Sequence, residues 1–373
     1  TAASLTGFAD INVTVTGGAI SIANANTLSG ATTGIVTASI SDSLSNFLHE
    51  TDGLDADAGN AGGENAFTIT LSDTSVSAAD LATLDARTSQ IINLTDVTTL
   101  SGTLTELKAF IAAEDNFGNK SGISTISVSA ENIDGAGGRG SVAELITFHT
   151  DIRDTGDGHG TPNVDLTNVT LLSGGISDLN TVRTTGTFTG KGAVGYTATD
   201  ASISIANANN LSGATSGVVT ATIADSTTAQ ILHETDGLNT DGGANAFTID
   251  ISNTSADAGD LASIHAKTSL TVALDKVETL TGTFTELKQY ITDQAQYTSK
   301  NGITTVTIDA QAIDGSGSNG TVAELITFHT DIRDTGDNHG TPNVNLTNVT
   351  LLSGNLSDLN TVRTTGTFTG KGA

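Results

Sequence analysis

The residue types with the most chemical potential gather in one short segment, which occurs twice. Residues 151–162 hold three aspartates and a histidine among glycines, and the same segment returns at residues 331–342. Carboxylate oxygens in a flexible, glycine-punctuated loop are the ligands that Ca²⁺ prefers. The segment therefore predicts a calcium site in each copy, with an ordinary Asp/Gly-rich turn at a helix end as the alternative. The predicted ligands are Asp151, Asp154, Asp157, Asp331, Asp334 and Asp337.

A second acidic loop follows a histidine in both halves of the chain. The run His-Glu-Thr-Asp at residues 49–52 returns at residues 233–236. Its acids are further candidate calcium ligands, namely Glu50, Asp52, Glu234 and Asp236. Farther along the loop, Asp55 and Asp57 are replaced by Asn239 and Asp241 in the second copy. The loss of a carboxylate between copies makes this the weaker of the two predicted metal sites.

The remaining motifs do not predict an enzyme. His149 and His159 could approach one another and bind zinc with Asp157, but His149 lies in an apolar helical pattern, which favours a hydrogen-bonded packing histidine. The sequence contains no nucleophile-elbow serine motif, phosphate-binding loop or dinucleotide fingerprint. Single arginines at helix ends, such as Arg153, are expected to cap carbonyls rather than to bind an acidic sugar. We therefore expect no catalytic residues and no organic cofactor.

Composition narrows the class of protein. The 373 residues carry 14 basic and 41 acidic side chains, a formal net charge of −27, and no Cys, Met or Trp. Excess negative charge without a basic cluster excludes nucleic acid as a partner, and the absence of cysteine excludes disulfides and thiol chemistry. No apolar run approaches the roughly 18 residues of a membrane span. A polar surface made mostly of Thr, Ser, Asn and Gly is typical of extracellular proteins. We therefore expect an extracellular, cell-surface location and, from the start at Thr1, a processed or excised part of a longer chain.

The chain is a tandem duplication. Residues 141–193 recur at residues 321–373 with only five differences, and the repeating unit is about 180 residues long. This predicts a first copy over residues 1–193, which includes a divergent N-terminal strand over 1–19, and a second copy over 194–373. Enzymes rarely carry nearly identical large domains in tandem, whereas adhesins, surface layers and stalk proteins often do.

Helix starts are marked by one capping residue followed three positions later by an acid. In such a capping box the first side chain accepts the N3 amide, and the acid reaches back to the N-cap amide. The predicted starts are Ser77, Thr103, Ser141 and Gly175 in the first copy, and Asp257, Thr283, Thr321 and Asn355 in the second. Each is followed by two or three turns of helical pattern.

Short β-rich runs lie between these helices, at residues 35–40, 67–71, 91–97, 123–128 and 164–172. Strands that alternate with short helices at this period indicate a parallel sheet. A β–α unit of this size cannot bury its own apolar face, so neighbouring units must stack. The predicted fold class is α/β: a repetitive strand–short-helix solenoid with a parallel sheet, in two tandem copies. Two separate compact α/β domains are the alternative.

Several phrases resemble the repeats of very large bacterial surface proteins. They are ATTGIVTASISD at 31–42, DLATLDARTS at 80–89, DVTTLSGTLTEL at 96–107 and SGATSGVVTATIAD at 212–225. In these phrases the chain resembles the giant repetitive cell-surface proteins of marine cyanobacteria, a group with a swimming-related surface protein and large repeat adhesins. The resemblance implies secretion, calcium-rich surroundings and a structural, adhesive or motility role. The calcium-binding nonapeptide that accompanies many such proteins is absent here, so its ligands do not carry over.

Together these patterns predict an extracellular structural repeat segment of a surface layer, fibre or giant adhesin, stabilised by calcium. A carbohydrate- or receptor-binding adhesin module is the alternative, although 4% aromatic residues without Trp provide few stacking platforms for sugars. The expected partners are copies of the chain itself, by end-to-end or lateral assembly, with glycans or the cell envelope as further candidates.

Overall fold

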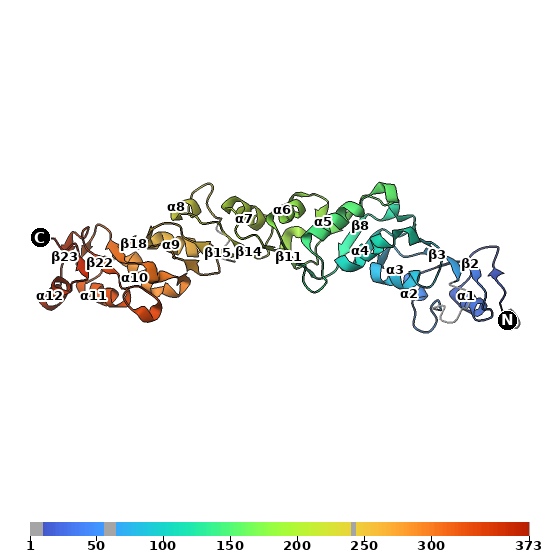
Figure 1. Cartoon of the computed structure of the whole chain (residues 1–373), viewed down its shortest axis with the longest axis horizontal. Helices are drawn as coiled ribbons and strands as arrows, with labels where there is room; N and C mark the ends of the chain where they lie inside the picture. Colours follow the sequence, from blue (N-terminus) through green and yellow to red (C-terminus); the bar gives the residue numbers. More distant parts are fainter. Residues whose placement is uncertain (1–9, 56–64, 240–243, 373) are drawn as a thin grey trace. The chain divides into compact units, whose positions relative to one another are not determined.

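The chain folds as a mixed α/β protein in which short parallel strands alternate with short helices (Figure 1). The computed structural model describes residues 10–55, 65–239 and 244–372. Two compact units divide the chain, Thr1–Val194 and Gly195–Ala373. The predicted α/β class with parallel strands is confirmed. Of the N-terminal strand expected over 1–19, residues 1–9 lie outside the described part of the chain.

The described residues of the first unit form six α-helices and twelve strands. The helices are α1 (Ile22–Ser29), α2 (Leu44–Phe47), α3 (Ala78–Asp85), α4 (Leu104–Ala112), α5 (Val142–Asp151) and α6 (Ile176–Thr184). The strands are β1 (Val13–Thr14), β2 (Val36–Asp42), β3 (Ala66–Leu71), β4 (Ser75–Ser77), β5 (Ile92–Asn93), β6 (Thr99–Gly102), β7 (Phe117–Gly118), β8 (Thr125–Val128), β9 (Asn132–Ile133), β10 (Asn163–Asp165), β11 (Leu171–Gly174) and β12 (Phe188–Thr189).

The described residues of the second unit form the same number of each. The helices are α7 (Ile205–Ser212), α8 (Thr228–Ile231), α9 (Ala258–His265), α10 (Phe284–Thr292), α11 (Val322–Asp331) and α12 (Leu356–Thr364). The strands are β13 (Gly195–Ala198), β14 (Val219–Thr222), β15 (Ala246–Asp250), β16 (Ser255–Asp257), β17 (Val272–Ala273), β18 (Thr279–Gly282), β19 (Tyr297–Thr298), β20 (Thr305–Ile308), β21 (Ala312–Ile313), β22 (Asn343–Asn345), β23 (Leu351–Leu352) and β24 (Phe368–Thr369).

Strand pairing follows one scheme in both units. In the first unit it gives the rows β1-β2-β3-β5-β7 and β4-β6-β8-β10-β12, and β9 pairs with β11. In the second unit it gives β13-β14-β15-β17-β19 and β16-β18-β20-β22-β24, and β21 pairs with β23. These pairs are all parallel. The register also agrees, since Leu100, Ile126 and Val164 are partners in one unit, as are Leu280, Val306 and Val344 in the other.

Asx turns carry the chain from one sheet to the next. Asn93 Oδ1 accepts the backbone N–H two residues on at 3.1 Å and ends β5, and Asp165 Oδ1 does the same at 3.0 Å after β10. These turns correct two sequence predictions. The run 164–172, expected to be one strand, is two strands joined by a turn, and the run 91–97 keeps only two strand residues.

The helix starts predicted from sequence are N-caps in both units, although the return bond of the capping box forms at only some of them. Full capping boxes form at Thr103, Ser141, Thr283 and Thr321. Ser77, Asp257 and Asn355 cap through their own side chains, and Gly175 has no side-chain cap. A cap of this kind contributes about 1 kcal/mol, so the sequence specifies helix starts by local contacts.

The core lies between these short elements. β2 buries every second residue from Val36, as a strand with one covered face does, and α4 buries one stripe made of Leu104, Leu107 and Phe110. Each helix packs on the next one in its unit, from α2 to α6 and from α8 to α12. None of the described helices has the length and apolar character needed to cross a membrane.

A glycine is required where the chain passes close to an Asx turn. Gly190 has φ +70°, and a Cβ there would lie 2.3 Å from Oδ1 of Asp165. Gly370 has φ +66° and would meet Asn345 in the same way at 2.4 Å. Only glycine combines this left-handed backbone with so close an approach.

Candidate functional site

One aspartate of residues 151–162, Asp154, caps its own backbone. Asp151 is the last residue of α5, and Asp154 caps the short 3₁₀ helix Thr155–Asp157 by accepting the N–H of Gly156 at 2.8 Å. Arg153 donates to the carbonyl oxygen of Pro162. The second unit repeats this arrangement at Asp331, Asp334 and Asp337. The segment thus forms an aspartate-capped turn.

The second acidic loop is a turn held by its histidine. Nδ1 of His49 accepts the N–H of Asp52 at 3.4 Å, and Nδ1 of His233 accepts that of Asp236 at 3.3 Å. The predicted ligands of this loop are exposed, namely Glu50, Asp52, Glu234 and Asp236. Asp57 and Asp241 lie outside the described residues.

Metal coordination requires several ligands at one point, and the predicted carboxylates are not gathered in this way. Across residues 10–55, 65–239 and 244–372, no group of three or more His, Asp or Glu side chains lies close enough to hold a metal ion. The residues present therefore do not form a calcium coordination shell within the described part of the chain.

The two histidines considered for zinc have different partners. His149 Nε2 lies 2.7 Å from Thr187 Oγ1, and the His149 ring stacks on Phe188 at a centroid distance of 4.3 Å. His159 Nε2 lies 2.6 Å from Oε2 of Glu114. Burial lowers the pKa of His149, and the nearby Arg153 lowers it further. His149 is thus a hydrogen-bonded packing histidine, and His329 repeats its contacts in the second unit.

A groove between two neighbouring helices recurs in both units. It has a volume of about 370 Å³ between α4 and α5, and about 290 Å³ between α10 and α11. The first groove is lined by Lys108, Ile111, Ala112, Glu144, Thr147, Phe148 and Asp151, and the second by the equivalent residues from Lys288 to Asp331. Each groove therefore combines an apolar floor with charged walls, and one predicted metal ligand lies in each.

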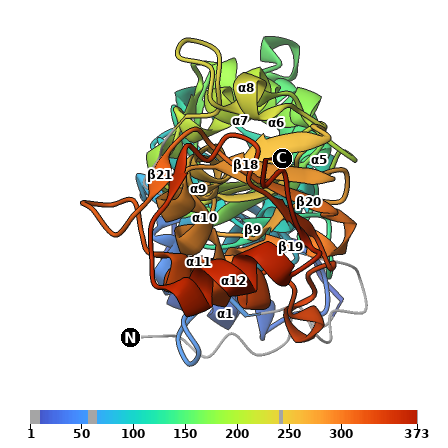
Figure 2. The same cartoon turned by 90° about the vertical axis from the view of Figure 1, so that its left-hand side faces the viewer.

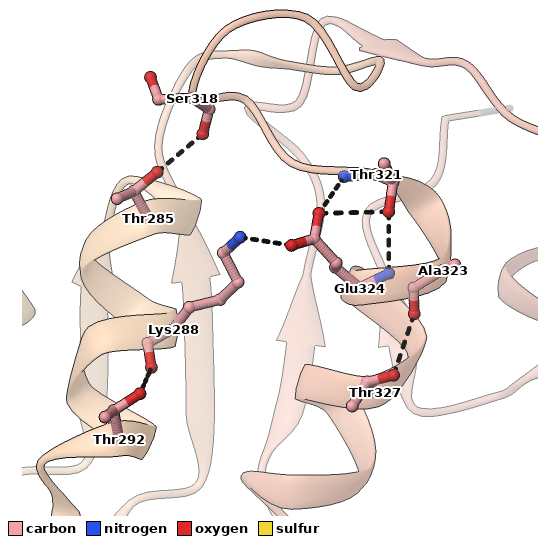
Figure 3. A network of polar contacts seen from close by, with 8 residues as sticks. All are labelled: Thr285, Lys288, Thr292, Ser318, Thr321, Ala323, Glu324 and Thr327. Atoms are coloured by element: carbon pink, nitrogen blue, oxygen red, sulfur yellow. Dashed lines mark hydrogen bonds and ion pairs between the residues drawn. The ribbon is translucent and has the colours of Figure 1, made fainter.

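An ion pair joins the helices that flank each groove. Lys288 Nζ lies 2.8 Å from Oε1 of Glu324 (Figure 3), and Lys108 pairs with Glu144 in the first unit. The second oxygen of Glu324 accepts the backbone N–H of Thr321 at 2.7 Å, so one carboxylate caps α11 and binds α10 at once. The ammonium of Lys288 and the Thr321 amide hold the pKa of Glu324 below its usual range. Any ligand of the groove meets a fixed charge pair.

Four carboxylates of the second unit influence one another, which the sequence analysis did not predict. Burial raises the pKa of Asp260 and of Asp309, and the charges of Asp257 and Glu286 raise both further. The first unit has serine at the positions equivalent to Asp257 and Asp309. The replacement of these two serines by aspartates in the second copy is the sequence feature from which the cluster could have been found. The cluster makes the second unit the more acid-rich of the two at this point.

The second unit also buries polar atoms that make no hydrogen bond. Among the described residues they include the Tyr290 hydroxyl and Oε1 of Gln294. The ring of His339, whose residue is 4% exposed, stacks on Tyr290 at a centroid distance of 6.0 Å. The equivalent residues of the first unit include Glu114 and His159, which pair with each other. At this place in the fold, the two units thus differ in whether their buried polar atoms have hydrogen-bond partners.

Most basic side chains hold backbone carbonyls rather than carboxylates. Of the 14 Lys and Arg residues, eight donate to main-chain carbonyl oxygens: Arg87, Lys120, Arg153, Lys191, Lys267, Lys300, Arg333 and Lys371. Four pair with carboxylates: Lys108, Arg139, Lys276 and Lys288. A net charge of −27 remains after all 14 cations are counted, so the surface attracts counterions.

The chain matches no protein-family model, no curated protein and no solved structure.

Proposed function

We propose that the chain is an extracellular structural repeat segment of a surface layer, fibre or giant adhesin, built as a strand–short-helix solenoid in two tandem copies. The observation that carries this proposal is the agreement of the two units in strand order, register and helix caps. A module that stacks its neighbours in register gains length by adding copies. The role is mechanical, and we propose neither catalysis nor a nucleic-acid partner.

Resistance to extension comes from contacts between successive elements of a unit. Buried strand partners such as Leu280, Val306 and Val344 stack directly on one another and are fully buried. Between the helices, Lys288 binds Glu324, and Thr285 donates to the carbonyl of Ser318 at 2.8 Å (Figure 3). An exposed ion pair contributes at most about 1 kcal/mol, so the parallel ladders and apolar layers dominate the stiffness.

Calcium enters this proposal as a counterion of the acidic surface. The described residues hold no coordination shell, but a net charge of −27 repels itself. Divalent cations outside a cell would screen this repulsion and favour the close approach of neighbouring copies. The self-partner expected from the sequence is therefore part of the proposal.

Surface labelling of intact producing cells tests the location. An antibody raised against the chain is expected to label intact cells as strongly as broken ones. Labelling that requires cell lysis would contradict an extracellular role. Electron micrographs of the labelled material would separate a fibre or surface layer from dispersed molecules.

The groove between α4 and α5 favours a second candidate, a carbohydrate- or receptor-binding adhesin module. Two grooves of similar lining in one chain would provide two-site binding. A glycan screen with the double variant Thr147→Trp/Thr327→Trp, which fills both grooves, tests this candidate. The matched control is Thr150→Trp/Thr330→Trp, because these exposed residues lie on the same helices outside the groove lining. A glycan bound by the wild type and the control but not by the groove variant would replace the structural role.

A further inference from the structure

One short turn is held by side-chain contacts in the first unit and is much less held in the second. It is a 3₁₀ helix followed by a two-residue strand, Glu114–Asn116 with β7 in the first unit and Gln294–Gln296 with β19 in the second. We call residues 114–119 turn 1 and residues 294–299 turn 2. Turn 2 follows α10, which packs on α9 and α11 (Figure 2).

Three side-chain contacts tie turn 1 to other elements of its unit. They run to the end of the Asp-rich turn, to the last residue of α3 and to β5. The pairs are Glu114–His159 at 2.6 Å, Asn116–Asp85 at 2.8 Å and Asn119–Asn93 at 2.7 Å. Because each partner comes from a different element, turn 1 leaves its place only when all three contacts break.

Turn 2 keeps one contact of this kind. Nε2 of Gln294 donates to the exposed Asp337 at 2.8 Å, while Oε1 of Gln294 is buried without a hydrogen-bond partner. The counterparts of the other two pairs form no hydrogen bond within the described part of the chain, and they are Gln296–His265 and Ser299–Ala273. The same backbone shape is therefore held by fewer contacts.

Two further replacements weaken the second unit at this place. Tyr290, in the last turn of α10, replaces Phe110 and is 2% exposed, and its hydroxyl has no hydrogen-bond partner among the described residues. A buried polar group without a partner is destabilising. Ser299 has φ +55° where Asn119 has φ +57°, and asparagine tolerates this left-handed backbone better than serine does.

We propose that turn 2 is the opening point of the second unit, where residues 294–299 detach from the fold while turn 1 stays closed. Opening separates β19 from β17, the one described strand with which β19 pairs. It also releases Lys300, whose Nζ donates to the carbonyl oxygen of Gln294 at 2.9 Å. The inference deepens the proposed structural function and rests on it for its biological meaning. A segment under load lengthens first at turn 2, while turn 1 keeps its contacts.

Native-state hydrogen exchange of the whole chain, read by NMR, compares the two turns. The Leu94 amide donates to the carbonyl of Gly118 at 2.9 Å, and the Leu274 amide donates to that of Thr298 at 3.1 Å, so these amides report matched strand contacts. The protection factor of Leu274 is expected to be at least about tenfold lower than that of Leu94, which corresponds to 1.4 kcal/mol. Equal protection, or lower protection at Leu94, would overturn the proposal.

Transfer of one contact from turn 1 to turn 2 tests the cause of the difference. Ala273→Asn/Ser299→Asn installs the asparagine pair of the first unit. It is expected to raise the protection of Leu274 by about threefold or more and to leave Leu94 unchanged. A double variant with the wild-type protection at Leu274 would refute the role of the missing contacts.

The opposite change loosens turn 1. Asn116→Ala removes the hydrogen bond to Asp85 and is expected to lower the protection of Leu94 by about threefold or more. Gln296→Ala is the matched control and is expected to leave Leu274 within about a factor of two. A control that loosens turn 2 as much as Asn116→Ala loosens turn 1 would also contradict the proposal.

Trypsin gives a second measurement without any substitution. Lys120 and Lys300 are 6% and 5% exposed, and each donates to the first carbonyl of its own turn. Cleavage after Lys300, relative to the same bond in the unfolded chain, is expected to be at least about tenfold faster than cleavage after Lys120. Equal relative rates would contradict the proposal. Surface labelling that required cell lysis would contradict the extracellular role and leave these rates unchanged, so the two failures are distinguishable.

Discussion

The buried His159 and the half-buried Glu114 form a polar pair in the first unit, with Nε2 of the imidazole 2.6 Å from Oε2 of the carboxylate. They lie 45 residues apart in the sequence and join the end of the Asp-rich turn to the 3₁₀ helix Glu114–Asn116. In the second unit Gln294 replaces the glutamate, so His339 lacks the carboxylate partner that His159 has. Two nearly identical folds thus treat one buried histidine differently.

Truncation of this partner is expected to affect only the first unit. Glu114→Ala leaves His159 buried without its acceptor and is expected to lower the free energy of unfolding by about 1–3 kcal/mol. Gln294→Ala is the matched control, since the Gln294 side chain donates to the exposed Asp337 and its backbone bond with Lys300 remains, and its effect is expected to stay within about 0.5 kcal/mol. Urea unfolding followed by circular dichroism measures both. Equal losses in the two variants would contradict a structural role for the pair.

The buried histidines predict a loss of stability in mild acid. Burial lowers the pKa of His339, Lys300 lowers it further, and the carbonyl of Asp331 opposes the shift together with the charges of Asp337 and Asp334. A folded pKa below the unfolded value near 6.5 means that the unfolded chain binds the proton first. Stability is therefore complete above pH 6.5 and falls as the pH drops through the folded pKa, and His149 and His329 contribute with the same sign.

The replacement His339→Gln tests this dependence. Its free energy of unfolding, measured with urea, is expected to fall less than that of the wild type between pH 7.5 and 5.5, with a difference of at most about 1.4 kcal/mol per pH unit. The slope is the readout, so a uniform loss of stability in the variant does not matter. Identical slopes would show that His339 does not carry the effect.

Removal of one carboxylate from the acidic cluster of the second unit is expected to stabilise it. Asp309→Ser installs the residue of the first unit and relieves repulsion from Asp257 and Glu286. Asp309 is only partly buried, so the expected gain at pH 7 is a few tenths of a kcal/mol, up to about 1. The folded pKa of Asp309 is raised, so this gain disappears as the pH falls through that pKa. Asp236→Ser, which removes an exposed carboxylate, is the control, and an equal gain there would point to net charge alone.

Substitutions of Glu324 are expected to separate its two roles, the cap of α11 at Thr321 and the ion pair with Lys288. Glu324→Gln keeps an oxygen for the Thr321 amide but loses the ion pair with Lys288, at a cost of at most about 0.5 kcal/mol that vanishes in high salt. Glu324→Ala also loses the cap and is expected to cost about 1 kcal/mol more at any salt concentration. Lys288→Gln is the control for the ion pair alone. Thermal melts at low and high salt measure the difference, and a large salt-independent loss in Glu324→Gln would refute this division.

Divalent cations are expected to act on the whole surface rather than at one point. Millimolar Ca²⁺ and Mg²⁺ are expected to raise the melting temperature by similar amounts, since both screen a net charge of −27. A chelator is expected to reverse the effect. A shift specific to Ca²⁺ at micromolar concentration would instead require a coordination site.

Local features of the fold were predictable from sequence, and contacts between distant residues were not. A capping box such as that of Thr103 needs only a bond to the third residue onward, so its sequence pattern is sufficient. The runs 35–40 and 67–71 were predicted as strands because their apolar residues alternate, and strands lie there at Val36–Asp42 and Ala66–Leu71. The run 164–172 was misread, because Asp165 interrupts an apolar pattern that continues on both sides of its turn.

The candidate sites depended on contacts that no local pattern contains. The sequence of the Asp-rich loops shows which side chains could bind a metal but not where those side chains point. The Asp154 carboxylate accepts a hydrogen bond from its own backbone, at Gly156. The groove pair of Lys108 and Glu144 joins residues 36 positions apart. For the acidic cluster around Asp309, the sequence shows only that the two copies differ at these positions. Whether the carboxylates lie close together depends on which strands are neighbours in the fold.

The use of lysine and arginine to hold carbonyls has a consequence for degradation. Trypsin-like proteases must draw a basic side chain into a specificity pocket before they cleave. Lys120 and Lys300 are 6% and 5% exposed, and Lys191 and Lys371 each bind three carbonyl oxygens. Cleavage at Lys120 and Lys300 therefore requires the fold to open first. A folded chain with so few basic residues, most of them bound to other groups of the protein, offers trypsin-like proteases few sites to cleave.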